Sequence, residues 1–196
     1  MFPDQPNITV RDPLAELLGA GTTPFTYTFN DAVKLAGHAC PTVAGAFLLI
    51  KRAMELLFPE EIPQRGDVMI HVPGRVEEGV TGPITQIFTL ISGAAAQNGF
   101  KGLAGQYNRM DLLRFQEPSL PPNAFRFTRI STGHQITLSY SPAAIPPSPT
   151  MGALMPLVLG NQATPEQRIT FGQLWRQRVE AILADAGQHT IVQHPA

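Results

Sequence analysis

The chain has 196 residues, of which 43% are apolar and 15% charged, and 14 Lys and Arg against 15 Asp and Glu leave a formal net charge of -1. This length fits one compact domain that folds without a disulfide or a structural metal. The balanced charge, with no basic run, argues against nucleic acid as a partner, because such binding needs a clustered basic face. The start of the chain has no signal-peptide pattern, and the apolar runs are shorter than the roughly 20 residues of a membrane span. We therefore expect a cytoplasmic protein without a membrane or nucleic-acid partner.

The first ten residues are predicted to be loosely packed, and two short helices follow them. Asp12 precedes a proline and a short apolar stretch, a combination typical of a helix start, so we expect a helix over residues 14–18. A second short helix is expected to begin at Asn30 and to end at Gly37, because asparagine is a preferred cap and glycine a preferred helix end.

The best-defined helix is predicted between Thr42 and Phe58, where apolar residues recur every three or four positions. Its first turns contain small residues, which suit close packing against backbone or another helix. The β-branched run at residues 66–72 predicts a strand. The apolar stretch at residues 83–97 begins with proline and predicts a buried helix.

Strands dominate the next part of the chain. Residues 110–115 are predicted to form a strand, and residues 125–130 and 134–141 an antiparallel hairpin. Four prolines between Ser141 and Pro149 indicate an extended linker.

The last helix is predicted to begin at Pro165, because Thr164 and Gln167 form a capping-box pattern around it. We expect its apolar stripe to pack either on its own domain or on a second copy of the chain. The stripe consists of Phe171, Leu174, Trp175, Val179, Ile182 and Leu183.

Helices and strands mix without a βαβ rhythm, so we predict an α+β fold in which an antiparallel sheet packs against helices. Three parts are expected along the chain. Residues 1–24 form an N-terminal segment, residues 25–141 an α+β core, and residues 142–196 a proline-rich linker with the C-terminal helix.

The clearest chemical signal is the stretch Gly37-His38-Ala39-Cys40-Pro41, directly before the long helix. Proline suits the first helical position, so Cys40 is predicted at the N-cap, where free amides and the helix dipole favour a thiolate. His38 lies outside the helix and can turn its imidazole toward the same space. Thiolate and imidazole together suit zinc, iron or copper, so the pair is half of a transition-metal site.

The remaining metal ligands have to come from other parts of the chain. We predict His71, at the end of one strand, and His134, at the start of another, as these ligands, with Asp67 as a further candidate. His189 and His194 fall in a C-terminal tail that we expect to be mobile.

The same motif permits two other chemistries. A Cys-His nucleophile pair needs the histidine within hydrogen-bond reach, which a spacing of two residues does not provide by itself. A Cys-Pro pair can also supply an axial thiolate to haem iron. Haem binding through Cys40 is therefore the alternative to a zinc site.

A glycine-spaced loop leads into a cluster of hydrogen-bonding residues at a junction of loop and strand. We predict that these residues line a polar ligand-binding site, with an exposed loop as the alternative. They are Gln106, Tyr107, Asn108 and Arg109.

With its Gly-His-Ala-Cys-Pro stretch and the small-residue helix after it, the chain resembles the formylmethanofuran dehydrogenase E family, as a distant, bacterial-type member with a variant tail. The likeness extends to about residue 116, because Gly93-Ala94, the glycine-containing loop at 98–105 and the strand at 110–115 occur in the family's order.

The resemblance implies an α+β core, frequent dimerisation and a metal pocket, but no assigned reaction. Family members place a cysteine and an aspartate where this chain has Pro83 and Gln86, and Ala94 replaces the cysteine of their Gly-Cys pair. Only His38 and Cys40 carry over.

We therefore expect a homodimer that binds zinc or another transition metal through His38 and Cys40, with a small-molecule ligand or redox partner at the open coordination position. Metal-assisted or redox chemistry on a small C1-type or nitrogenous substrate is implied by the family name alone. Residues 142–196 match no part of the family.

Overall fold

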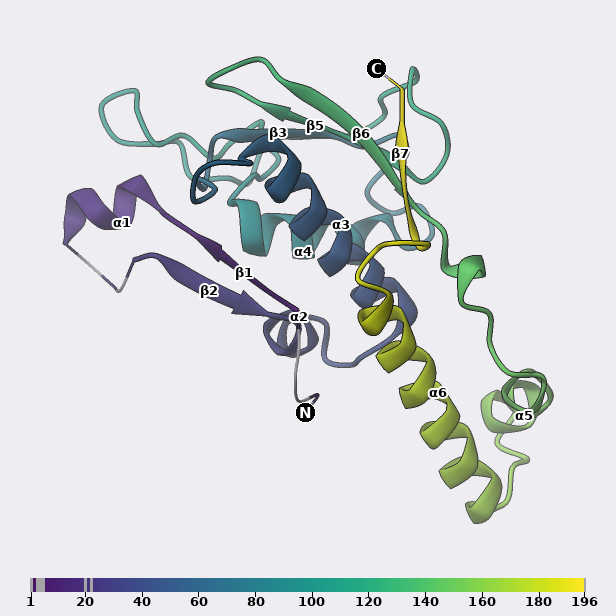
Figure 1. Cartoon of the computed structure of the whole chain (residues 1–196). Helices are drawn as coiled ribbons and strands as arrows, with labels where there is room; N and C mark the ends of the chain where they lie inside the picture. The colour runs from purple at the N-terminus through teal and green to yellow at the C-terminus, as the bar shows by residue number, and fades with distance from the viewer. Residues whose placement is uncertain (1, 3–5, 20, 22, 196) are drawn as a thin grey trace.

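The computed structural model describes residues 2, 6–19, 21 and 23–195 and has the predicted α+β architecture. A five-stranded sheet packs against helices α3 and α4, with Phe88 of α4 in ring contact with two phenylalanines of the sheet (Figure 1). Within the described residues its neighbouring strands are antiparallel except β4 and β3, which run parallel. In spatial order the strands are β4 (Leu113–Arg114), β3 (Val68–His71), β5 (Ala124–Arg129), β6 (Gln135–Tyr140) and β7 (Ile191–His194).

The predicted hairpin is confirmed, because β5 and β6 pair antiparallel with Phe127 opposite Ile136. Side chains alternate between the two faces of a strand, so buried residues such as Phe125 and Phe127 face the helices, while Arg126 and Thr137 lie on the outer face.

The strand predicted at residues 110–115 is much shorter, since β4 contains only Leu113 and Arg114. Asp111 has a φ of 61°, in the left-handed region, and the chain turns there instead of extending.

Helix α3 (Pro41–Leu57) is the central element, and eleven of its 17 residues are buried. This confirms the predicted helix and its small-residue start. Gly45 in that start lies against the ring of Tyr140 in β6, where a side chain at position 45 would overlap the ring. The absence of a β-carbon thus lets helix and strand approach each other.

Helix α4 (Thr81–Ser92) ends before the predicted limit at residue 97. Gly93 takes a left-handed φ of 75° and donates its backbone N–H to the carbonyl oxygen of Thr89, which closes the helix. The backbone after Gly93 then turns toward the loop that leads to β4.

The N-terminal residues were expected to be loosely packed, and for residues 7–10 this is wrong. They form β1 (Asn7–Val10), which pairs antiparallel with β2 (Phe25–Thr28), and Ile8 and Val10 are buried. Pairing with a strand that follows in the sequence holds the segment in place. Residues 1 and 3–5 lie outside the described part of the chain.

Both predicted short helices are confirmed. Helix α1 (Pro13–Leu18) is capped by the Asp12 side chain, which accepts the backbone N–H of Leu14. Helix α2 (Phe29–Ala36) begins one residue before the expected position and ends at Gly37.

The C-terminal region contains more structure than the prediction allowed. Helix α6 (Pro165–Asp185) has the predicted capping box, whereas the 3-10 turn η1 (Pro142–Ala144) and helix α5 (Pro149–Leu159) stand in and after the expected linker. Strand β7 pairs with β6, so the tail expected to be mobile is part of the sheet. Contacts therefore cross the predicted boundary at residue 142.

Asp185 holds the turn between α6 and β7. Its carboxylate accepts hydrogen bonds from the backbone and side chains of His189 and Thr190. Burial opposes the charged form, but these hydrogen bonds outweigh it and lower the pKa of Asp185 to about 2.

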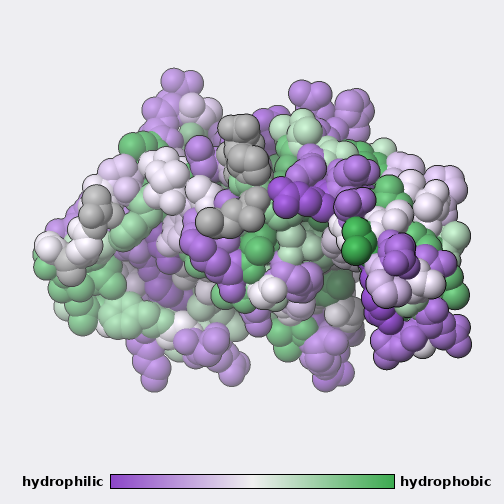
Figure 2. Space-filling model, turned by 90° about the horizontal axis from the view of Figure 1, so that it is seen from below, coloured by the Kyte–Doolittle hydropathy of each residue, from purple (hydrophilic) through white to green (hydrophobic). Residues whose placement is uncertain are grey.

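The surface is mixed in character. At the end of the molecule where α1 lies, on the left of Figure 2, apolar residues reach the surface, and Leu18 is 58% exposed. Among the described residues, no helix combines the length and apolar character that a membrane crossing requires.

The contact between Gly45 and Tyr140 gives a stability prediction. Gly45→Ala forces the new methyl group against the Tyr140 ring, so we expect a loss of about 1–3 kcal/mol in the free energy of unfolding, measured by urea denaturation. Gly172→Ala in α6 is the matched control, because no atom lies near its added methyl group, and it should gain about 0.5–1 kcal/mol. Equal effects of the two substitutions would contradict the packing argument.

Candidate functional site

The Gly-His-Ala-Cys-Pro motif lies between α2 and α3. Gly37 ends α2 with a φ of 77°, and Cys40 is the N-cap of α3, as predicted. The Cys40 sulfur accepts the backbone N–H of Val43 at 3.4 Å. Cys40 is half-buried and packs against the hydrophobic core, whereas His38 is exposed.

The hydrogen bond of His38 fixes how its ring is protonated. Its Nδ1 lies 3.0 Å from the carbonyl oxygen of Ala36. A carbonyl oxygen only accepts hydrogen bonds, so Nδ1 carries the proton, and in the neutral ring Nε2 keeps a lone pair. Metal-ligating histidines have this arrangement, with the second nitrogen donating to a carbonyl or carboxylate. His38 and Cys40 thus fit the role of a nitrogen and a sulfur ligand.

Two aromatic side chains distant in sequence hold the backbone of the motif. Trp175 of α6 donates its Nε1–H to the carbonyl oxygen of Ala39 at 2.9 Å, and Tyr140 of β6 donates its hydroxyl to that of Pro41 at 2.8 Å. Burial raises the pKa of Tyr140, and the nearby Cys40 acts in the same direction. Neither contact follows from the sequence, because nothing in the local pattern relates these positions.

His134 lies far from this motif. It precedes β6, whose other end is Tyr140, the residue that contacts Pro41. His134 lies six positions before Tyr140, which is about 20 Å at the usual rise of a strand. The structure therefore does not bring His134 to His38 and Cys40.

His71 lies on the wrong side of the sheet for the predicted set of ligands. Its neighbours Ile70 and Val72 are fully buried toward the helices, so the His71 side chain lies on the outer face. Its Nδ1 is buried without a hydrogen-bond partner among the described residues, and burial lowers the pKa of His71.

Across residues 2, 6–19, 21 and 23–195, no three His, Cys, Asp or Glu side chains group to hold a metal. Asp67 is engaged elsewhere, in hydrogen bonds with Ser131 and Arg129.

The four predicted ligand-binding residues do come together. They line one cavity of about 220 Å³ between the loop that carries them and the start of α1. We call this the loop cavity. Its lining residues are Pro13, Gln64, Arg65, Gly66, Gln106, Tyr107, Asn108 and Arg109.

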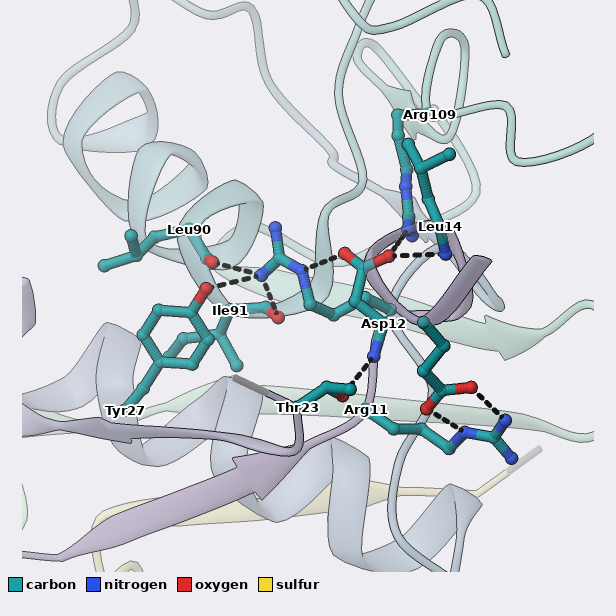
Figure 3. Close-up of polar contacts among 10 residues, drawn as sticks. Arg11, Asp12, Leu14, Thr23, Tyr27, Leu90, Ile91 and Arg109 are labelled. Carbon is teal, nitrogen blue, oxygen red and sulfur yellow. Dashed lines mark hydrogen bonds and ion pairs between the residues drawn. The ribbon is translucent and has the colours of Figure 1, made fainter. Parts of the chain in front are cut away.

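An ion cluster forms one wall of the loop cavity (Figure 3). The Asp12 carboxylate accepts Nε–H of Arg65 at 3.0 Å and Nη2–H of Arg109 at 2.8 Å, besides its helix-capping bond to Leu14. Arg65 also donates through Nη1 to the carbonyl oxygens of Leu90 and Ile91. The cluster therefore ties α1 and the C-terminal end of α4 together. We predicted Asp12 only as a cap, and no pattern in the sequence indicated Arg65.

Arg109 is the most buried member of the cluster, with 8% of the residue exposed. Burial lowers the pKa of Arg109, while Asp12 opposes this change. Its Nη1 is buried and has no hydrogen-bond acceptor among the described residues. A buried guanidinium nitrogen without an acceptor is rare in folded proteins.

Larger cavities lie elsewhere among the described residues. One of about 620 Å³ has Ile84 of α4 and Phe125 of β5 in its wall, one of about 370 Å³ has Leu90 of α4 and Phe115, and one of about 310 Å³ has Leu138 of β6 and Ile191 of β7. Cys40 lines none of these three.

No protein-family profile matches the chain, and no curated protein matches its sequence. The resemblance to the formylmethanofuran dehydrogenase E family therefore rests on the Gly37-His38-Ala39-Cys40-Pro41 stretch and the segments that follow it.

The ion cluster gives a second stability prediction. Asp12→Asn keeps a good helix cap but leaves two largely buried guanidinium groups without their carboxylate, so we expect a loss of about 3 kcal/mol in the free energy of unfolding. Glu16→Gln removes a more exposed ion pair with Arg11 and should cost less than about 1 kcal/mol. Chemical denaturation of both variants measures the difference, and a small, equal loss in both would rule out the cluster as a stabilising centre.

Proposed function

We propose that this protein binds a transition metal, zinc first, through Cys40 and His38 at the N-terminal end of α3, in the manner implied by its resemblance to the formylmethanofuran dehydrogenase E family. The observation that carries the proposal is the His38 hydrogen bond to Ala36, which leaves Nε2 free to ligate two residues from the Cys40 sulfur. Thiolate and imidazole are both common zinc ligands in proteins.

The surroundings of Cys40 support the role of its sulfur as a ligand. A metal ligand has to be the thiolate, and the Val43 N–H at the N-cap stabilises negative charge on sulfur. Trp175 and Tyr140 hold the carbonyl groups of Ala39 and Pro41, on either side of Cys40. The backbone that positions the sulfur ligand is therefore rigid. A free cysteine also agrees with the cytoplasm, where thiols stay reduced.

Only two ligands come from the described residues, so the remaining coordination positions are open to a small-molecule ligand, a redox partner or a second copy of the chain. A metal with open positions binds or activates small molecules, whereas a closed shell of four protein ligands is structural. We therefore propose that the metal centre serves binding or catalysis and is not a structural zinc site.

Elemental analysis by mass spectrometry on untagged, anaerobically purified protein tests this proposal. We expect about one zinc per chain, lost in the double variant His38→Ala, Cys40→Ala and retained in the control His71→Ala, His134→Ala. Full occupancy in the first double variant contradicts the proposal. Iron with a Soret band that Cys40→Ala removes would replace it with haem ligation.

We also propose that the chain forms a homodimer through α5. This helix contains no charged residue and is apolar around its circumference, yet among its described residues only Met151 is buried. It packs against α6, and the two helices extend away from the sheet (Figure 1). A helix that is apolar on all sides is normally covered. Because α5 has no charged residue, two copies can also meet around a two-fold axis without like charges in contact.

Leu159 is the residue to change, because it lies at the end of α5 and is 77% exposed. We expect the wild type to sediment as a dimer at micromolar concentration and Leu159→Glu to weaken the association at least tenfold, by sedimentation equilibrium. Leu18→Glu, in the exposed part of α1, is the control and should remain dimeric. A wild type that stays monomeric contradicts the proposal.

A further inference from the structure

The loop cavity has an excess of positive charge in its wall. Two guanidinium groups, from Arg65 and Arg109, share the single carboxylate of Asp12. Within the described part of the chain, the ion pairs of Arg65 and Arg109 are both with Asp12, so two positive charges beside the cavity are balanced by one negative charge. A charge in a largely buried position is costly unless an opposite charge accompanies it.

The geometry of Arg109 also leaves hydrogen-bonding capacity unused. Its Nη2 donates to Asp12, whereas Nη1 meets no acceptor among the described residues. Nη1 lies beside Gly66, which has a φ of 82° and also lines the cavity, and the guanidinium occupies the space of a side chain at that position. Arg109 is thus packed against backbone that offers it no partner, next to a cavity wide enough for several water molecules.

The loop on the other side of the cavity is built to hold one conformation. Leu103 and Gln106 exchange two backbone hydrogen bonds around a tight turn. Tyr107 has a φ of 59°, a left-handed conformation that non-glycine residues rarely adopt. The Asn108 side chain bonds to both backbone groups of Met110. Backbone strain in a fixed loop is typical of residues that position a ligand.

From these observations we propose that the loop cavity binds the oxyanion group, carboxylate or phosphate, of a small molecule, with Arg109 and Arg65 as its charge partners. Planar guanidinium groups match the geometry of both oxyanions. The anion would balance the excess charge while the bonds to Asp12 stay in place. The volume of about 220 Å³ limits the ligand to a small molecule or to one anionic end of a larger one.

This site is separate from the proposed metal centre. The cavity adjoins Pro13 of α1, whereas the backbone beside Cys40 bonds to Trp175 of α6, and the two helices lie on opposite sides of Figure 1. Each site can therefore fail its test without the other.

The test is isothermal titration of the full chain with inorganic phosphate and, separately, with acetate and oxalate. Removing an arginine would disturb the fold, so the variant is Gln64→Glu, which adds a carboxylate to the cavity lining and leaves Arg65, Arg109 and Asp12 unchanged. Gln173→Glu makes the same change of charge on the exposed surface of α6 and is the control. If Gln64→Glu fails to fold, Gln106→Glu in the exposed part of the lining replaces it.

We expect saturable binding of one anion per chain, weakened at least tenfold by Gln64→Glu and unchanged by Gln173→Glu. Tighter binding of phosphate indicates a phosphorylated ligand, and tighter binding of acetate or oxalate a carboxylate ligand. If the anion still binds to the double variant His38→Ala, Cys40→Ala, its site is separate from the metal centre. Absence of saturable binding by all three anions, or equal affinity in Gln64→Glu and wild type, would overturn the proposal.

Discussion

The burial of α3 is the constraint on which the rest of the structure depends. Eleven of its residues are enclosed by the sheet and the other helices, so the helix cannot turn or slide without exposing apolar surface, at roughly 25 cal/mol for each Å². That fixed position carries the Cys40 N-cap with it. Gly45 allows the close contact with Tyr140, and Tyr140 in turn holds the carbonyl group of Pro41. The packing of the core therefore also fixes the backbone that carries the candidate metal ligands.

The two proposed sites use opposite chemistry on one scaffold. Beside Cys40 the candidate ligands are a sulfur and an imidazole nitrogen, whereas beside Arg109 two guanidinium groups share one carboxylate. Asp12 connects the second site to the fold, because one carboxylate caps α1 and pairs with two arginines. Asp12 thus holds the backbone beside the loop cavity in place. Because its single carboxylate pairs with two arginines, the cavity wall keeps a net positive charge.

Local signals in the sequence predicted the elements that depend on local physics. The cap at Asp12, the capping box of α6 and the turn between β5 and β6 are set by residues close to each other in the chain. Strands β1 and β7 were missed, since each is stabilised by a partner strand that the local pattern does not identify. The same limit applies to the site. His38 and Cys40 are two residues apart, whereas the position of His71 depends on which face of the sheet its strand presents, and Arg65 meets Asp12 only through the tertiary fold.

X-ray absorption at the zinc edge of the zinc-loaded, untagged protein tests the central claim most directly, because it reports the atoms bound to the metal. Ligation by Cys40 and His38 predicts one sulfur at about 2.3 Å and imidazole nitrogen at about 2.0 Å, with oxygen or nitrogen from non-protein ligands completing the shell. A shell of oxygen and nitrogen without sulfur would show that zinc binds elsewhere and would contradict the account.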